Sequence, residues 1–440
     1  MIKTSFYRKI CVMFAMVLLS FFAFPCMQWN VHADDNDDRM LYNNYIYYTI
    51  NSSNEVVIQD VRTSITEAEI PAEIDGYSVT EIGNYAFKDC TRLTSVTIPD
   101  SVVKIGAYAF KDCTALTDLT IPNSVTEIGW GIVEGTPWLA YQTDDFVVAG
   151  DGILLAYRGA DSDVAVSNTV RCISGYAFSG CETVCFVSFS ENLTVIDAFA
   201  FDQCTNLETI TFSEHLTKIG EYAFHWCTSL KKVDLPDSVV TLGDHAFSYC
   251  KALTRVKLSA YMTTIENMTF SCCVSLTEVT IPESVTAIGN YAFQNCIALE
   301  SITLSQGLTV INVGIFDGCT SLTQITILNP ECIIADDSTT LSEQADIYGM
   351  VVSTANTYAI KYAHKFTALD WMRGDYDGDG ILTVQDAYQI LVVFASDSAG
   401  VPQTLTDTEI YAADYNDDGC INTQDAYAVM VAFAQSADGC

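Results

Sequence analysis

Basic residues are scarce in this chain of 440 residues, which has 20 Lys and Arg against 55 Asp and Glu and a net charge of −35. A field of this sign repels nucleic acid and anionic membranes, so neither is expected as a partner. Histidine is also rare, with five residues scattered singly, and the common metalloprotease, serine-hydrolase and phosphate-loop motifs do not occur. We therefore do not expect an enzyme.

Long apolar runs are lacking too, apart from residues 10–24. This run is shorter than the roughly 20 residues that cross a bilayer, so it does not predict a membrane-embedded protein. Lys3, Arg8 and Lys9 precede it, and a short segment after it ends in small residues at 31–33. The pattern predicts a signal peptide over 1–33 and a secreted, extracellular protein. Its removal takes away three bases and no acid, which leaves 17 bases and a net charge of −38.

The middle of the chain repeats with a period of 23 residues, and rows begin at 79, 102, 170, 193, 216, 239, 262, 285 and 308. Such a period predicts a solenoid, in which stacked coils bury one continuous core. Within a row, the segment 93–98 (LTSVTI) alternates as a half-buried strand does, with Val96 and Ile98 inward. We expect a solenoid over 79–330 with a parallel sheet on its concave face. An irregular insert at 125–169 reads as a hairpin with its turn at Gly150–Gly152.

The row pattern L-x-x-V-x-I-P-x-x-V-x-x-I-G-x-x-A-F-x-x-C resembles the leucine-rich repeats of the BspA-like (Treponema-type) class, over roughly 70–330. That resemblance implies a secreted or surface-bound bacterial protein that serves adhesion or protein binding. It names no ligand.

Both ends of the solenoid have the features of caps, because they depart from the row pattern. Residues 34–78 are expected to form an N-terminal β cap, with two strands and a polar turn within 42–61. Residues 331–370 are expected to form a C-terminal cap that includes a helix over 354–366. A separate module is expected at 371–440.

Nine of the 17 cysteines occupy one position of the row: Cys90, Cys113, Cys181, Cys204, Cys227, Cys250, Cys273, Cys296 and Cys319. We call them the ladder cysteines. Disulfides are the first expectation in an exported protein. Stacked copies, however, point the same way, whereas disulfide geometry needs side chains that converge. The favoured prediction is buried, unpaired thiols that pack as small apolar residues.

Two acidic loops near the C-terminus share the ligand spacing of an EF-hand, at positions 1, 3, 5, 7, 9 and 12 with glycine at 6. Oxygen ligands in this number favour calcium over a transition metal. The sequence therefore predicts two Ca²⁺ ions. The candidate ligands are Asp375, Asp377, Asp379, Ile381, Thr383 and Asp386 in the first loop, and Asp414, Asn416, Asp418, Cys420, Asn422 and Asp425 in the second.

A helical segment follows each loop, and position 12 is Asp where EF-hands usually have Glu. A loop–helix duplicate of this kind resembles the type I dockerin, over about 372–440. The resemblance implies a small all-α calcium module that binds a scaffoldin cohesin. Carried over to this chain, the cohesin-binding positions are Val384, Gln385, Leu391, Val392, Thr423, Gln424, Met430 and Val431. Core packing is the alternative role for the four apolar helix residues among them.

Two neighbouring rows carry an unusual group of bases, Lys231 and Lys232 in one and Arg255 and Lys257 in the next, beside Asp234. Outward strand positions elsewhere are mostly Thr and Ser. One reading is that these bases only relieve repulsion among the acids. The other is a ligand face for an acidic partner segment or an anionic glycan.

Three functions fit these features. The first is a non-catalytic component of a cellulosome, attached by its dockerin while the solenoid binds a protein or glycan ligand. The alternative is a cell-surface adhesin for host or neighbouring cells, anchored through the same module. The third is a binding regulator of companion enzymes.

Overall fold

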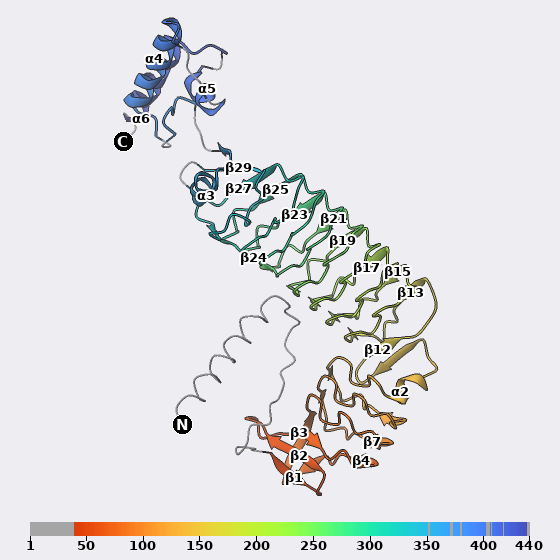
Figure 1. The fold of residues 1–440 in the computed structure, drawn as a ribbon. Helices are drawn as coiled ribbons and strands as arrows, with labels where there is room; N and C mark the ends of the chain where they lie inside the picture. The colour runs from red at the N-terminus through yellow and green to blue at the C-terminus, as the bar shows by residue number, and fades with distance from the viewer. Residues whose placement is uncertain are drawn as a thin grey trace, which may run out of the picture.

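The computed structural model describes residues 39–437 except 351–352, 370–372, 379–380, 402–404, 406 and 417. The predicted signal peptide, residues 1–33, lies outside the described residues. Within them, no helix combines the length and the apolar character needed to cross a bilayer. The coils stack into a curved solenoid that is followed by a small helical module (Figure 1).

The solenoid begins with an antiparallel meander of β1 (Met40–Tyr42), β2 (Ile46–Ile50) and β3 (Val56–Val61). β3 then pairs in parallel with β6 (Tyr77–Ile82), which carries the short antiparallel strand β5 (Glu73–Ile74). The meander thus covers the open edge of the first coil with paired backbone.

Each coil contributes one strand to each of two parallel ladders, and we name them by their position in Figure 1. The outer ladder follows the outer edge of the arc, as the labels β13 to β25 show, whereas β24 of the inner ladder lies toward the inner edge. The expectation that the strand segment of each row forms the concave face is therefore wrong. Coils of 23 residues are confirmed by the register, in which Val96 pairs with Leu119 and Val233 with Val256.

The strands of the outer ladder are β4 (Glu67–Glu69), β7 (Ser95–Thr97), β9 (Asp118–Thr120), β13 (Asp163–Ala165), β15 (Phe186–Ser188), β17 (Thr209–Thr211), β19 (Lys232–Asp234), β21 (Arg255–Lys257), β23 (Glu278–Thr280), β25 (Ser301–Leu304), β27 (Gln324–Ile327), β29 (Asp346–Gly349) and β30 (Phe366–Ala368). Those of the inner ladder are β6, β8 (Lys104–Ile105), β10 (Glu127–Ile128), β12 (Ile153–Tyr157), β14 (Cys172–Ile173), β16 (Val195–Ile196), β18 (Lys218–Ile219), β20 (Thr241–Leu242), β22 (Thr264–Ile265), β24 (Ala287–Ile288), β26 (Val310–Ile311) and β28 (Ile333–Ile334).

The core of each coil comes from the same row positions. Phe247, Cys250 and Leu253 of one coil have no exposed surface, and their counterparts in neighbouring coils are equally buried. The phenylalanine rings stack from coil to coil, with centroids 5.1 Å apart between Phe224 and Phe247. A coil has no other element to cover this face, so it is buried only when a neighbour stacks on it.

Two residues in each coil adopt the left-handed backbone conformation, for example Tyr222 at φ 55° and Trp226 at φ 58°. For residues other than glycine this conformation costs about 1–2 kcal/mol. Gly314 and Gly318 occupy the same two positions in a later coil, where that cost is absent. Stacking offsets the strain elsewhere, since the Tyr222 ring lies 4.3 Å from that of His245 in the next coil.

The expected hairpin in the insert is present as β11 (Phe146–Ala149) and β12, which pair antiparallel across the turn at Gly150–Gly152. The short helix α2 (Pro137–Ala140) precedes it. The buried apolar residues form two clusters that divide here, one from Ile46 to Ile153 and one from Leu154 to Ala359. β12 pairs with β14 and so restarts the inner ladder.

At the far end, the helix α3 (Thr354–Tyr362) packs on β28 and β29. It is shorter than the helix expected over 354–366, because Ala363 takes the left-handed conformation and ends it. The chain then forms β30, which pairs with β29 and closes the outer ladder.

The ladder cysteines are free thiols in this structure. All are buried except the half-buried Cys181, and each buried thiol from Cys113 onward donates to the carbonyl oxygen of a phenylalanine in the preceding coil, as Cys250 does to Phe224 at 3.2 Å. Burial raises the pKa of Cys227, Cys250 and Cys273 well above that of an ordinary thiol. They therefore lack the thiolate that would react.

We expect the buried ladder cysteines to resist a maleimide reagent in the folded protein and to react in denaturant without reductant, because only unfolding exposes them. Cys420, which is exposed, serves as the internal control and should react at once. The measurement is the mass of the labelled protein before and after denaturation. Disulfide-linked peptides among the nine would contradict this prediction.

Candidate functional site

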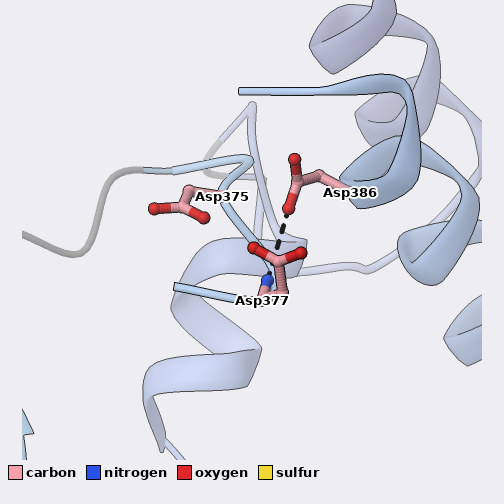
Figure 2. Close-up of side chains that lie close together, drawn as sticks. All are labelled: Asp375, Asp377 and Asp386. Carbon is pink, nitrogen blue, oxygen red and sulfur yellow. Dashed lines mark hydrogen bonds between the residues drawn. The ribbon is translucent and has the colours of Figure 1, made fainter. Parts of the chain in front are cut away.

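Three carboxylates of the first acidic loop come together in the C-terminal module. Oxygen atoms of Asp375, Asp377 and Asp386 all lie within 4.8 Å of one another. Figure 2 shows the three side chains close together. Asp375 and Asp386 have no exposed surface, and Asp377 is exposed. Carboxylates this close repel one another unless a cation or a proton neutralises them. The acidic triad, as we name these three residues, could hold a divalent metal ion.

Asp386 is held in place by the start of α4 (Val384–Ser398). Its Oδ2 accepts hydrogen bonds from the backbone N–H and the hydroxyl of Thr383, both at 2.7 Å, which forms a capping box. Its Oδ1 accepts from the N–H groups of Tyr376 at 2.9 Å and Asp377 at 3.3 Å. One carboxylate therefore joins the beginning of the loop to the beginning of the helix.

Gly374 sets the entry to the first loop. It lies at φ +93°, and a Cβ atom there would come within 2.6 Å of the Tyr415 ring and 2.7 Å of Val429. Its N–H donates to the carbonyl oxygen of Ala412, so the two halves of the module approach closely at this point. Burial in this region, together with the negative charge of Glu409, raises the pKa of Tyr376.

The second loop repeats part of this hydrogen-bond pattern but has an amide, Asn416, where the first loop has Asp377. Asp425 has no exposed surface and accepts from Asn416 N–H at 3.1 Å and Asn422 N–H at 2.8 Å, as Asp386 does in the first loop. Asp414 accepts from the N–H groups of Asp418 and Gly419. Within the described residues, only the first loop gathers three acidic side chains. A second metal site thus stays a prediction.

The remaining predicted ligands in the two loops do not belong to the acidic triad. Asp379 lies outside the described residues. Thr383 caps α4, and its hydroxyl accepts from Gln385 N–H at 3.1 Å. Ile381 and Cys420, which the EF-hand spacing would use through their carbonyl oxygens, have exposed side chains. The Cys420 carbonyl accepts from the side chain of Asn422 at 3.0 Å.

The predicted partner-binding residues of the module lie on α4 and on α6 (Thr423–Ala437). All eight are exposed, including the apolar residues Leu391, Val392, Met430 and Val431 at 36–45%. More than half of the surface of each of these four is covered, so partial core packing stays their alternative role. The core of the module consists of Ala387, Ile390, Ala413, Ala426 and Val429.

Sequence reasoning missed three features of the module. Tyr388 and Tyr427 stand at equivalent positions of α4 and α6 and are 61% and 69% exposed. The repeated phrase Gln-Asp-Ala-Tyr in both copies was the available signal. A helix, α5 (Asp407–Ala413), also enters the second loop, whereas the segment before the first loop is not helical where it is described.

The five charged residues predicted as a ligand face lie on or next to two adjacent strands of the outer ladder, β19 and β21. Lys232 pairs in register with Arg255, and Asp234 pairs with Lys257. Arg255 Nη2 lies 3.7 Å from Asp234 Oδ1, and Lys231 Nζ lies 2.5 Å from Glu208 Oε2. Within the described part of the chain, Lys232 and Lys257 have no ion-pair partner. The structure therefore brings the five predicted residues onto one face and neutralises only two of the four bases.

We expect Asp375→Ala in the full chain to lower calcium affinity at the first loop at least tenfold and to unfold the module, because metal binding would neutralise the triad. The solenoid should stay folded, since its coils depend only on neighbouring coils. Calorimetric calcium titration and far-UV circular dichroism measure the two effects. Asp397→Ala, an exposed acid near the end of α4, is the matched control. Equal calcium binding by both variants would contradict the assignment.

A family model described as BspA type leucine rich repeat region matches six copies over residues 60–136, 160–273 and 217–339. Among solved structures, a leucine rich cell surface protein from Faecalibacterium prausnitzii is 25% identical, with 79% of this chain and 98% of that chain covered and a TM-score of 0.35. A leucine-rich repeat protein from Bacteroides ovatus is 23% identical, with 75% and 99% covered and a TM-score of 0.37. The search of curated proteins found no match.

The match to the repeat model covers more than half of the chain and is interrupted at the insert, where the core also divides. The TM-scores are below 0.5, so the assignment rests on the repeats. Leucine-rich repeat proteins are generally non-catalytic binding proteins, and the solenoid described above indicates the same role. The chain belongs to the BspA-type leucine-rich repeat proteins.

Proposed function

We propose that this protein is a non-catalytic, exported binding protein that works at the cell surface, where its solenoid adheres to a protein or glycan of a host or a neighbouring cell. The observation that carries this proposal is the charged group on the outer ladder, Lys231, Lys232, Asp234, Arg255 and Lys257. Lys232 and Lys257 have no acidic partner in the described structure, although acids outnumber bases almost threefold in the chain. Unpaired charges on an exposed sheet are available to a ligand.

The C-terminal module would attach the protein to its surface. We propose that it binds two Ca²⁺ ions, one at the acidic triad and one in the second loop, which closes around its ion when calcium is present. The shared hydrogen-bond pattern of Asp386 and Asp425 supports this equivalence. Calcium would then order the loops that begin α4 and α6 and so present their exposed apolar residues to a partner.

A second candidate function is that of a cellulosome component or a regulator of companion enzymes, held on a scaffoldin by a dockerin–cohesin contact. The observation that favours it is the duplication of exposed apolar residues on two equivalent helices, with Leu391 and Val392 on one and Met430 and Val431 on the other. The two candidates differ in the ligand of the solenoid. Identifying that ligand therefore distinguishes them, whereas binding by the C-terminal module does not.

Reversing the charge of Lys232 and Arg255 to Glu should weaken capture of the protein on immobilised mucin at least fivefold at low salt. The loss should shrink at high salt, because ions screen charges on an exposed face. Surface plasmon resonance on mucin, with plant cell-wall polysaccharide as a second surface, measures capture. Arg92→Glu with Lys218→Glu makes the same charge change elsewhere and is the control.

If both double variants are captured on mucin as well as the parent is, the charged residues of the outer ladder have no role in adhesion. Capture on plant polysaccharide alone, lost in the Lys232 and Arg255 variant, would favour the cellulosome component over the adhesin.

If α4 and α6 are interchangeable binding surfaces, substitution on one helix should weaken binding to a type I cohesin by less than threefold. Joint substitution of Val384, Gln385, Thr423 and Gln424 should abolish it, because no intact copy remains. Calorimetry in calcium, with chelator as the control, measures this. A large loss from either pair alone would establish a single binding mode, and no binding by the parent would exclude the dockerin–cohesin contact for that cohesin.

A further inference from the structure

Two hollows open along the outer ladder, one at the carboxyl ends of the charged strands β19 and β21 and one in the coils that follow. One, of about 330 Å³, lies between Phe212, Asp234, Pro236 and Lys257. The other, of about 420 Å³, lies farther along the solenoid and extends from Thr277 to Leu328. The backbone pairing of the outer ladder is interrupted at both places, between β17 and β19 and between β23 and β25. The hollows and the bases thus form one continuous strip across consecutive coils.

The first hollow has one base, Lys257, beside the acids Glu214, Asp234 and Asp237, whereas the second has acids alone. The rim of the second hollow carries Glu278 and Glu283 and no basic residue. Glu278 has no ion-pair partner among the described residues, although it pairs in register with Arg255. Its carboxylate is therefore available to a cation from outside. The strip presents free positive charge at Lys232 and Lys257 and, in the next coil, free negative charge at Glu278.

The floor of the second hollow is apolar and partly open. Val279 is half-buried, whereas its counterparts Val256 and Ile302 are 2% and 3% exposed. Thr277, Thr280 and Thr303 also line this hollow, and the Thr277 hydroxyl donates to the carbonyl oxygen of Thr254 at 3.1 Å. An apolar floor with threonines beside it suits the aliphatic stem of a lysine side chain whose ammonium group meets a carboxylate at the rim.

We propose that this strip, from Lys232 to the hollow at Glu278 and Glu283, binds an extended polypeptide segment of a partner protein that carries acidic side chains followed or preceded by basic ones. The acidic side chains lie on Lys232 and Lys257, and a basic one enters the second hollow. This inference rests on the proposed binding role of the solenoid and adds the class of its ligand. Complementary charge is what selects this segment over a uniformly anionic chain.

The spacing of the coils fits such a segment. Neighbouring coils are about 4.8 Å apart, so Lys232 and Glu278, two coils apart, are separated by roughly 10 Å along the solenoid. An extended peptide rises about 3.3 Å per residue, and every second side chain is on the same face. Acidic and basic residues two to four positions apart therefore reach the two ends of the strip.

The test uses the full chain and a fluorescent peptide, Thr-Glu-Thr-Glu-Thr-Lys-Thr-Lys-Thr, in a fluorescence polarisation titration at low salt. We expect Lys232→Glu or Glu278→Lys alone to weaken binding about tenfold. The variant with both changes should recover most of the affinity, because the peptide can then bind in the opposite direction. Glu67→Lys, at the equivalent position of strand β4 on the same ladder, should bind as the parent does.

A peptide with four glutamates in place of the two glutamates and two lysines should bind the parent at least tenfold more weakly. This inference would be overturned if the two peptides bound equally well or if Glu278→Lys had no effect. The basic residues alone would then form the binding site. If the parent binds polygalacturonate and the Glu278→Lys variant binds it more tightly, the strip is assigned to an anionic glycan instead. Absence of peptide binding to the parent would also overturn it, whereas the proposed adhesive function is judged separately by capture on mucin.

Discussion

The stacking of one coil on the next is the interaction on which the rest of this molecule depends. Phe247, Cys250 and Leu253 have no exposed surface only because neighbouring coils cover them. Backbone hydrogen bonds keep the coils in register, as when Phe224 N–H donates to the carbonyl oxygen of Ala246 at 2.8 Å. A coil alone could satisfy neither its apolar side chains nor its backbone groups, so the array has to be capped at both ends.

The same register makes a binding surface possible. Outward side chains of successive strands fall into columns about 4.8 Å apart, so charges that lie 23 residues apart in the chain become neighbours. Lys232, Arg255 and Glu278 form such a column. Where the pairing of the outer ladder is interrupted, the sheet opens into hollows, and Lys257 lines one of them while Glu278 lines the other.

The C-terminal module is organised by a different constraint, because its small core leaves the loops to be ordered by polar groups. A buried carboxylate there must find N–H donors or a cation. Asp386 and Asp425 find backbone N–H groups in the same way. Asp375 and Asp377 join Asp386 in the acidic triad, whereas the second loop has Asn416 in the place of Asp377. The two loops thus share their spacing but differ by one carboxylate at this position.

The sequence by itself determined the 23-residue coils, the inward residues such as Val96, the hairpin of the insert and the buried ladder cysteines, because each depends on a local pattern that repeats. It also located the acidic loops and the charged rows. Only the tertiary structure decided that the strand segment lies on the outer edge, that Lys231 and Arg255 are paired while Lys232 has no ion-pair partner among the described residues, and that three acids of the first loop come together (Figures 1 and 2). These outcomes follow from the curvature of the whole stack and from the competition of backbone N–H groups and neighbouring charges for the same side chains. Such a competition involves atoms that are distant in the sequence, and no spacing within one row describes it.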